Sequence, residues 1–217
     1  MSHIKSVGLE LEGGWHKPFE DVSIGYDGSV KRPSNIKEAE HWGELVSDPL
    51  PPASVPEWLR TYYPDGTGNT CGFHIHTSFT NYSDYYKLTS RRFYNHFLRE
   101  WERWRLQEQA NYPNELDEDS PFYQRLDGLS LAGTEAAYAQ RSFQPQNQLA
   151  QTGKGDNRRR THLNYCFKLH GTLECRLLPM FYSKDLGVKA AMFYLGMVEC
   201  YLENVPDDPI NTIEVRG

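Results

Sequence analysis

The sequence predicts an α+β fold in which an antiparallel β-sheet carries helices on one of its faces. Three observations support this fold class. Strand-like segments dominate residues 1–80, helical spacing dominates residues 83–144, and a β-hairpin followed by one helix completes the chain. Strands and helices do not alternate regularly, which argues against a parallel sheet. The face of an antiparallel sheet that helices leave uncovered is free to carry polar side chains.

The N-terminal part contains the strand-like segments. "HIKSVGLELEGG" predicts a strand that ends at Gly13-Gly14, and Asp27-Gly28 indicates a hairpin turn between two short β-prone pieces. "HWGELV" predicts another strand, which Asp48-Pro49 stops. A short helix within residues 53–63 and a glycine-rich loop then lead to the strand "TCGFHIHTSF".

The remaining segments alternate between helical and loop patterns. The strongest helical spacing runs from Ser83, the expected N-cap, to Ala110, and Pro113 ends it. A second helical part is expected within residues 114–144, and the polar residues 144–161 are expected to form a mobile loop. A hairpin turning at His170-Gly171 and an amphipathic helix from about Ser183 to Pro206 complete the prediction.

The composition indicates one soluble domain spanning residues 1–217, with 24% charged residues and a mean hydropathy of −0.70. A formal net charge of −6 does not favour nonspecific nucleic-acid binding. No apolar run approaches the roughly 20 residues of a membrane span. The four cysteines form no CxxC pair and the sequence shows no secretory leader, so we expect reduced thiols and a cytoplasmic protein without membrane or nucleic-acid partners.

Polar residues occur two positions apart in several of the predicted strands, and side chains at this spacing share one face of a sheet. The set comprises Glu10, Glu12, Glu44, His74, His76, Glu174 and Arg176. A solvated sheet face explains any single pair. Together, however, carboxylates and imidazoles are the ligands of divalent cations, and clustered carboxylates repel one another unless a cation or an arginine lies among them.

The residue types leave the identity of the metal open between zinc and a harder ion. An HxH pair with a carboxylate is compatible with zinc, whereas four glutamates favour Mg²⁺ or Mn²⁺ and suit the phosphates of a nucleotide. Arg158–Arg160 precede a strand and could bind phosphate, although a solvated loop explains this run equally well. No Walker motif, dinucleotide fingerprint or nucleophile triad is present in the sequence.

Five motifs follow one another in the chain: "GLELEGG", "GELVSDPL", "GFHIHTSF", "RRRTHLN" and "GTLECRLL". This ordered set resembles the amidoligase family of the glutamine synthetase and glutamate–cysteine ligase superfamily. The resemblance implies a curved antiparallel sheet of the glutamine synthetase type, with helices on its outer face and the active site on its concave face. It also implies ATP-dependent joining of a carboxylate to an amine through an acyl phosphate, with Mg²⁺ or Mn²⁺ as the metal.

The resemblance also assigns roles to individual residues. It implies that the metal ligands are Glu10, Glu12, Glu44, His74 and Glu174. His76 would face the nucleotide or the substrate, Arg160 and Arg176 would bind phosphate or the substrate carboxylate, and Asn164 would contact the nucleotide. The expected partners are small-molecule or peptide carboxylates and amines, whose identity no motif reveals.

Two other functional classes stay open at the level of sequence. One is a zinc-dependent amidohydrolase that uses His74, His76 and glutamates. The other is a non-catalytic binding protein on a decayed ligase fold. The presence of all the polar strand residues argues against the second class.

Overall fold

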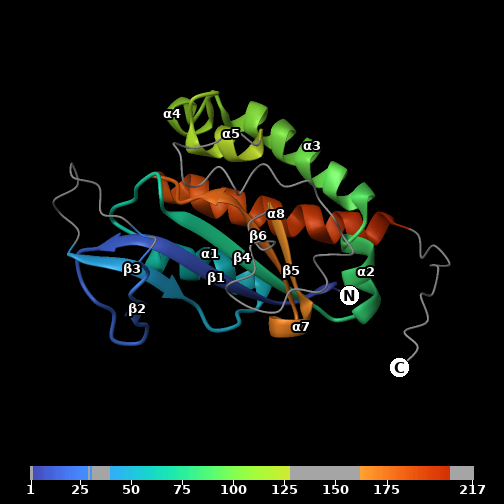
Figure 1. The fold of residues 1–217 in the computed structure, drawn as a ribbon, viewed down its shortest axis with the longest axis horizontal. Coiled ribbons are helices and arrows are strands. Elements are labelled where there is room, and N and C mark those ends of the chain that lie inside the picture. Colours follow the sequence, from blue (N-terminus) through green and yellow to red (C-terminus); the bar gives the residue numbers. More distant parts are fainter. Residues whose placement is uncertain (1, 29, 31–39, 128–161, 206–217) are drawn as a thin grey trace.

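The structure is a computed structural model, and it describes residues 2–28, 30, 40–127 and 162–205. Six strands form one sheet in the order β2-β3-β1-β4-β6-β5, and every neighbouring pair is antiparallel (Figure 1). The strands are β1 (Ile4–Trp15), β2 (Ile24–Gly25), β3 (His41–Val46), β4 (Gly72–Phe79), β5 (Leu163–Cys166) and β6 (Thr172–Pro179). The predicted α+β class with an antiparallel sheet is thereby confirmed.

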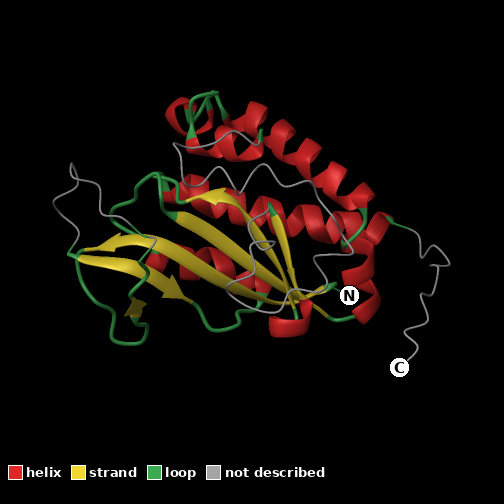
Figure 2. Ribbon diagram, viewed as in Figure 1, coloured by secondary structure: helices red, strands yellow, loops and turns green. Residues whose placement is uncertain are grey.

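Helices cover one face of this sheet. The helices among the described residues are η1 (Pro52–Ser54), α1 (Val55–Tyr62), α2 (Tyr82–Leu88), α3 (Arg91–Glu108), α4 (Pro113–Leu116), α5 (Pro121–Leu126), α7 (Phe167–His170), which connects β5 to β6, and α8 (Lys184–Asn204). In Figures 1 and 2, α1 and α8 lie behind the strands, so the opposite face of the sheet is turned toward the viewer. α3 packs on α8 through aromatic pairs such as Trp101 with Phe193.

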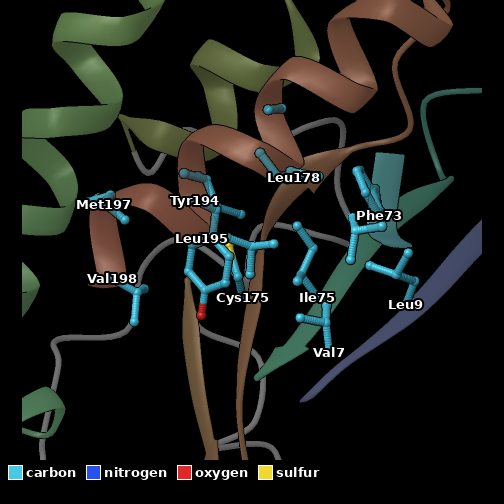
Figure 3. Close-up of a cluster of buried hydrophobic side chains, with 14 of the residues drawn as sticks. Val7, Leu9, Phe73, Ile75, Cys175, Leu178, Tyr194, Leu195, Met197 and Val198 are labelled. Carbon is cyan, nitrogen blue, oxygen red and sulfur yellow. The ribbon is translucent and has the colours of Figure 1, made fainter. Parts of the chain in front are cut away.

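The main core lies between the sheet and α8. Val7 and Leu9 of β1, and Ile75 of β4, belong to the same buried cluster as Tyr194 and Leu195 on α8 (Figure 3). Because side chains alternate along a strand, burying Val7 and Leu9 on this face turns the residues between and after them to the other face. The apolar periodicity of β1 and β4 therefore determines which face carries the polar residues.

The structure corrects two predicted boundaries. The long helix expected from Ser83 is divided into α2 and α3, and the Ser90 hydroxyl caps α3 by accepting a hydrogen bond from the Phe93 amide. Ser83 lies inside α2, whose N-cap is Asn81, so the predicted cap is wrong. A Ser/Thr hydroxyl that bonds a nearby backbone amide offers the chain an alternative to continuing the helix.

The first strand also continues beyond its predicted end, to Trp15. Gly13 and Gly14 do not stop it; they allow a loop to pack closely against it. A Cβ atom at Gly13 would lie 2.6 Å from Pro64 Cβ, and the Gly14 amide donates to the Gly66 carbonyl at 2.8 Å. The glycines are thus required by packing and not by a turn.

The other predicted elements fall partly inside the described residues. The C-terminal hairpin is confirmed as β5 and β6, and α7 with Gly171 at a φ of 65° makes its turn. Ser183 caps α8 by accepting from the Leu186 amide, which confirms the predicted start of that helix. Much of the second piece of the Asp27-Gly28 hairpin, the expected loop at 144–161 and the end of the second helical part lie outside the described residues.

Candidate functional site

The strand register brings the predicted polar residues onto the face of the sheet that α1 and α8 leave uncovered. Glu10 of β1 lies opposite His74 of β4, and Glu12 lies opposite Glu44 of β3. On the other side of β4, His76 lies opposite Glu174 of β6. Residues that are distant in sequence therefore form neighbouring rows on one surface.

A bulge in β6 follows Arg176. Between the pairs Ile75–Cys175 and Phe73–Leu178, β4 advances by two residues and β6 by three. Arg176 shares the polar face with Glu174 by alternation, and the extra residue returns Leu178 to the core, which alternation alone would have placed on the polar face. β5 then adds Asn164, directly opposite Glu174.

This face is far less exposed than a solvated sheet surface. The exposed fraction is 3% for Glu174, 5% for His74 and 7% for Glu12. Burying ionised side chains is unfavourable unless they are paired and hydrogen-bonded. The polar side chains do point away from the helices, as expected, but they are buried and not solvated. The hydrogen bonds and ion pairs among them are therefore the central feature of the site.

Glu10 lies at the centre of this network because each of its carboxylate oxygens accepts a hydrogen bond from one histidine. Nδ1 of His74 donates to Oε2 at 3.0 Å, and Nε2 of His76 donates to Oε1 at 3.0 Å. Burial alone would raise the pKa of Glu10, but the two imidazoles outweigh it and hold this pKa well below its usual range. The same arrangement raises the pKa of His76: burial opposes its charge, while Glu10 and Glu174 favour it.

Glu174 is the second buried carboxylate of the face. It forms an ion pair with Arg176 and accepts a hydrogen bond from the side-chain amide of Asn164. Its Oε1 also lies 3.8 Å from Nδ1 of His74 and 3.8 Å from Nε2 of His76. Burial raises the pKa of Glu174, yet Arg176 and the two histidines outweigh it and lower this pKa overall.

Gly72 creates the space for the other side of the His74 ring. Its amide donates to Oε2 of Glu12 at 2.6 Å. A Cβ atom at this position would lie 2.7 Å from Nε2 of His74 and 3.3 Å from Oε2 of Glu12. One edge of the imidazole thus faces Glu10 and Glu174, while the other edge faces Glu12 across a residue that has no side chain.

The five predicted metal ligands gather into two groups of donor atoms that share His74. One group consists of Glu10, His74 and Glu174, and the other of Glu12, Glu44 and His74; within each group the donor atoms lie within 4.8 Å of one another. Glu12 and Glu44 face each other directly across two strands, where like charges destabilise a sheet unless something positive lies between them. The donor set therefore fits divalent cations.

Two residues that the sequence analysis did not single out, Cys166 and Thr172, also contribute to this face. Cys166 lies with His76 and Glu174 in a third group of possible donors, and Thr172 bonds Nδ1 of His76 at 3.0 Å. Strand parity could have found Cys166, because it lies two residues after Asn164 and so shares its face. Arg160 lies outside the described residues.

Comparison with known proteins found no matching family, no similar curated protein and no similar solved structure. Among the residues that the structure describes, no helix combines the length and the apolar character needed to cross a membrane.

Proposed function

We propose that this protein is an ATP-dependent carboxylate–amine ligase that uses Mg²⁺ or Mn²⁺, on a sheet of the glutamine synthetase type. The observation that carries the proposal is the convergence of all five predicted metal ligands into two donor groups joined by His74. Four carboxylates and one imidazole make a largely oxygen donor set, which hard divalent ions prefer. A buried face lined by several carboxylates also suits metal-bound phosphates better than a bare anion.

The proposed reaction requires a carboxylate to be activated before an amine attacks it, and ATP would supply this activation as an acyl phosphate. Bound divalent ions would contribute charge neutralisation of the nucleotide phosphates. Arg176 is buried beside Glu174 and presents a guanidinium on the same face, where it can pair with a phosphate or a substrate carboxylate. His76 lies next to Arg176 and Glu174. Its ring is oriented by hydrogen bonds to Glu10 and Thr172.

The helices on one face and the polar residues on the other agree with the architecture that the proposed ligase requires. A zinc amidohydrolase would use fewer carboxylates, typically three protein ligands with water in the fourth position. Here the histidines are bonded to Glu10, and the glutamates outnumber them around both donor groups. The arrangement favours the ligase over the hydrolase.

Calorimetry of Mg²⁺ and ATP binding tests the proposal without a known substrate. The unmodified protein is expected to bind ATP more tightly when Mg²⁺ is present, and Glu10→Gln and Glu12→Gln are each expected to remove that enhancement. Glu57→Gln is the matched control, because Glu57 is an exposed glutamate on α1. Circular dichroism would verify that each variant is folded.

Two outcomes would overturn the proposal. The first is MgATP binding that is the same in Glu10→Gln, Glu12→Gln and the unmodified protein. The second is one tightly held equivalent of zinc in the purified protein together with no binding of MgATP, which would favour the hydrolase instead.

A further inference from the structure

The third donor group differs chemically from the other two because it contains a thiol. His76 of β4, Cys166 of β5 and Glu174 of β6 place a nitrogen, a sulfur and an oxygen within 4.8 Å of one another. Sγ of Cys166 lies 3.5 Å from Oε2 of Glu174, and Nε2 of His76 lies 3.8 Å from Oε1 of the same carboxylate. The three residues come from three adjacent strands, so the sheet holds them in place.

A small tetrahedral ion sets the scale against which these separations are compared. Bonds of about 2.0–2.3 Å in a tetrahedron place neighbouring ligand atoms roughly 3.3–3.8 Å apart. The two separations that involve Glu174 are of this size, but they run to different oxygens: Oε2 for Cys166 and Oε1 for His76. Thr172 supports the ring from outside, because its hydroxyl can accept from Nδ1–H of His76. Nε2 donates to Oε1 of Glu10 in this structure, so an ion bound through Nε2 would replace that hydrogen bond.

Asn164 provides an independent indication of a ligand at this position. It is 3% exposed, and its amide nitrogen donates to Sγ of Cys166 at 3.0 Å and also to Glu174. Among the described residues, its buried oxygen Oδ1 has no hydrogen-bond partner. A buried carbonyl without a partner is costly. Rotating the amide by half a turn would direct this oxygen toward the thiol and carboxylate, as a fourth donor to an ion between them, and would turn Nδ2 to the position that Oδ1 now occupies.

We propose that His76, Cys166 and Glu174, with Asn164 as a fourth donor, form a binding site for a thiolate-preferring divalent ion such as Zn²⁺ or Co²⁺. Sulfur and imidazole ligands favour such ions, whereas Mg²⁺ takes oxygen ligands. Cys166 would bind as the thiolate and release its proton to solvent. The site does not depend on the proposed ligase function, but it shares Glu174 with the Glu10–His74–Glu174 group, so its occupation would compete with a hard ion there.

Absorption spectroscopy with Co²⁺ tests the site directly, because a thiolate bound to Co²⁺ gives a charge-transfer band. The experiment uses the full chain carrying Cys200→Ser, since Cys200 is an exposed thiol that could bind the ion by itself. This parent is expected to show the band with one equivalent of Co²⁺. Cys166→Ser is expected to lose it and to bind Co²⁺ at least about tenfold more weakly, since losing even an outer-shell partner costs about 10–100-fold.

Cys175→Ala is the matched control. Cys175 is next to Glu174 in sequence but lies in the core on the opposite face, near Tyr194, so the band should persist in this variant. Cys71→Ala serves the same purpose if Cys175→Ala fails to fold.

The absence of a thiolate band in the parent would overturn the proposal, and this result needs no variant. A band that persists in Cys166→Ser, or that disappears equally in a folded control, would also overturn it. Failure of MgATP binding would leave this spectrum unchanged, so the two proposals fail separately.

Discussion

Glu10 shows how one residue organises the whole polar face. Its two oxygens each accept from a different histidine, and these two imidazoles offset the cost of burying the carboxylate. Glu174 is stabilised in the same way, by an ion pair with Arg176 and a hydrogen bond from Asn164. Glu10 is therefore stabilised by β4, and Glu174 by its own strand and by β5, so changing one of these residues should alter the titration of its neighbours.

Replacing Glu10 is expected to lower the pKa of His76. Burial by itself lowers this pKa, and the bond to Glu10 is the largest of the effects that raise it. In Glu10→Gln that bond no longer carries a charge, so His76 should lose its proton at a lower pH than in the unmodified protein. Histidine titration by NMR would measure this, with Glu57→Gln as a control that leaves His76 unchanged. An unaltered His76 titration in Glu10→Gln would contradict the role given to Glu10.

Gly72 offers a steric test of the second donor group. In Gly72→Ala the added methyl group would lie 2.7 Å from Nε2 of His74, so the imidazole must move away from Glu12. We expect divalent-ion affinity to fall by at least about tenfold, as in other cases where ligand orientation is lost. Gly196→Ala is the control, because nothing lies within 4 Å of a Cβ at Gly196 and removing a helical glycine should stabilise α8 by about 0.5–1 kcal/mol. Equal ion affinity in both variants would show that Gly72 makes no space for the site.

At the scale of elements, short polar signals decide where helices begin. The apolar spacing of Phe93, Phe97 and Trp101 correctly indicates α3, but it cannot tell whether α2 belongs to the same helix. The Ser90 side chain decides this by capping α3. In the sheet, a single extra residue in β6 likewise decides that Leu178 lies in the core, although alternation from Glu174 and Arg176 would place it on the polar face.

The cap predicts a difference between two serines in the same region. Ser90→Ala removes the acceptor of the Phe93 amide and should reduce the free energy of unfolding by about 1 kcal/mol. Ser83 lies exposed within α2, so Ser83→Ala should change the free energy of unfolding by less than about 0.5 kcal/mol. Urea denaturation of both variants would measure the difference, and equal effects would contradict the division into two helices.

At the scale of the molecule, long-range contacts join the two ends of the described chain. Glu199 of α8 accepts hydrogen bonds from the amides of His3 at 3.0 Å and Ile4 at 2.8 Å. β1 therefore begins against the last helix and then runs through the middle of the sheet, between β3 and β4. His162 connects other parts: its Nε2 donates to the Arg125 carbonyl at 2.6 Å, and its Nδ1 accepts from the Tyr94 hydroxyl at 2.8 Å.

Because of His162, we expect the free energy of unfolding to decrease in mild acid. Burial lowers the pKa of this imidazole in the folded protein, so below the unfolded value of about 6.5 the unfolded chain binds more protons. Its contribution to stability is therefore present above that pH and is lost as the pH falls. His76, with a raised pKa, contributes in the opposite sense: its stabilisation is present below the unfolded value and is lost as the pH rises through its folded pKa.

Comparing the unmodified protein with the His162→Gln variant isolates the effect of His162. Between about pH 7 and about pH 5, the urea midpoint of the unmodified protein should fall more than that of His162→Gln, which cannot gain a proton there. Equal changes in the two midpoints would show that His162 does not resist protonation. The carboxylates Glu10 and Glu174, whose pKa values are lowered, lose their stabilising contribution only below the unfolded value of about 4.3.

The sequence alone determined the fold class and the face of the sheet on which the polar residues lie. Alternation along a strand is a local property, so Val7 and Leu9 in the core oblige Glu10 to face the other way. Register, bulges and contacts between strands are not local, and only the tertiary structure brought His74 between two carboxylate groups and Cys166 beside Glu174. The burial of this face could not be predicted from the sequence either. Burial depends on the packing of the whole chain and not on the spacing of residues within one strand.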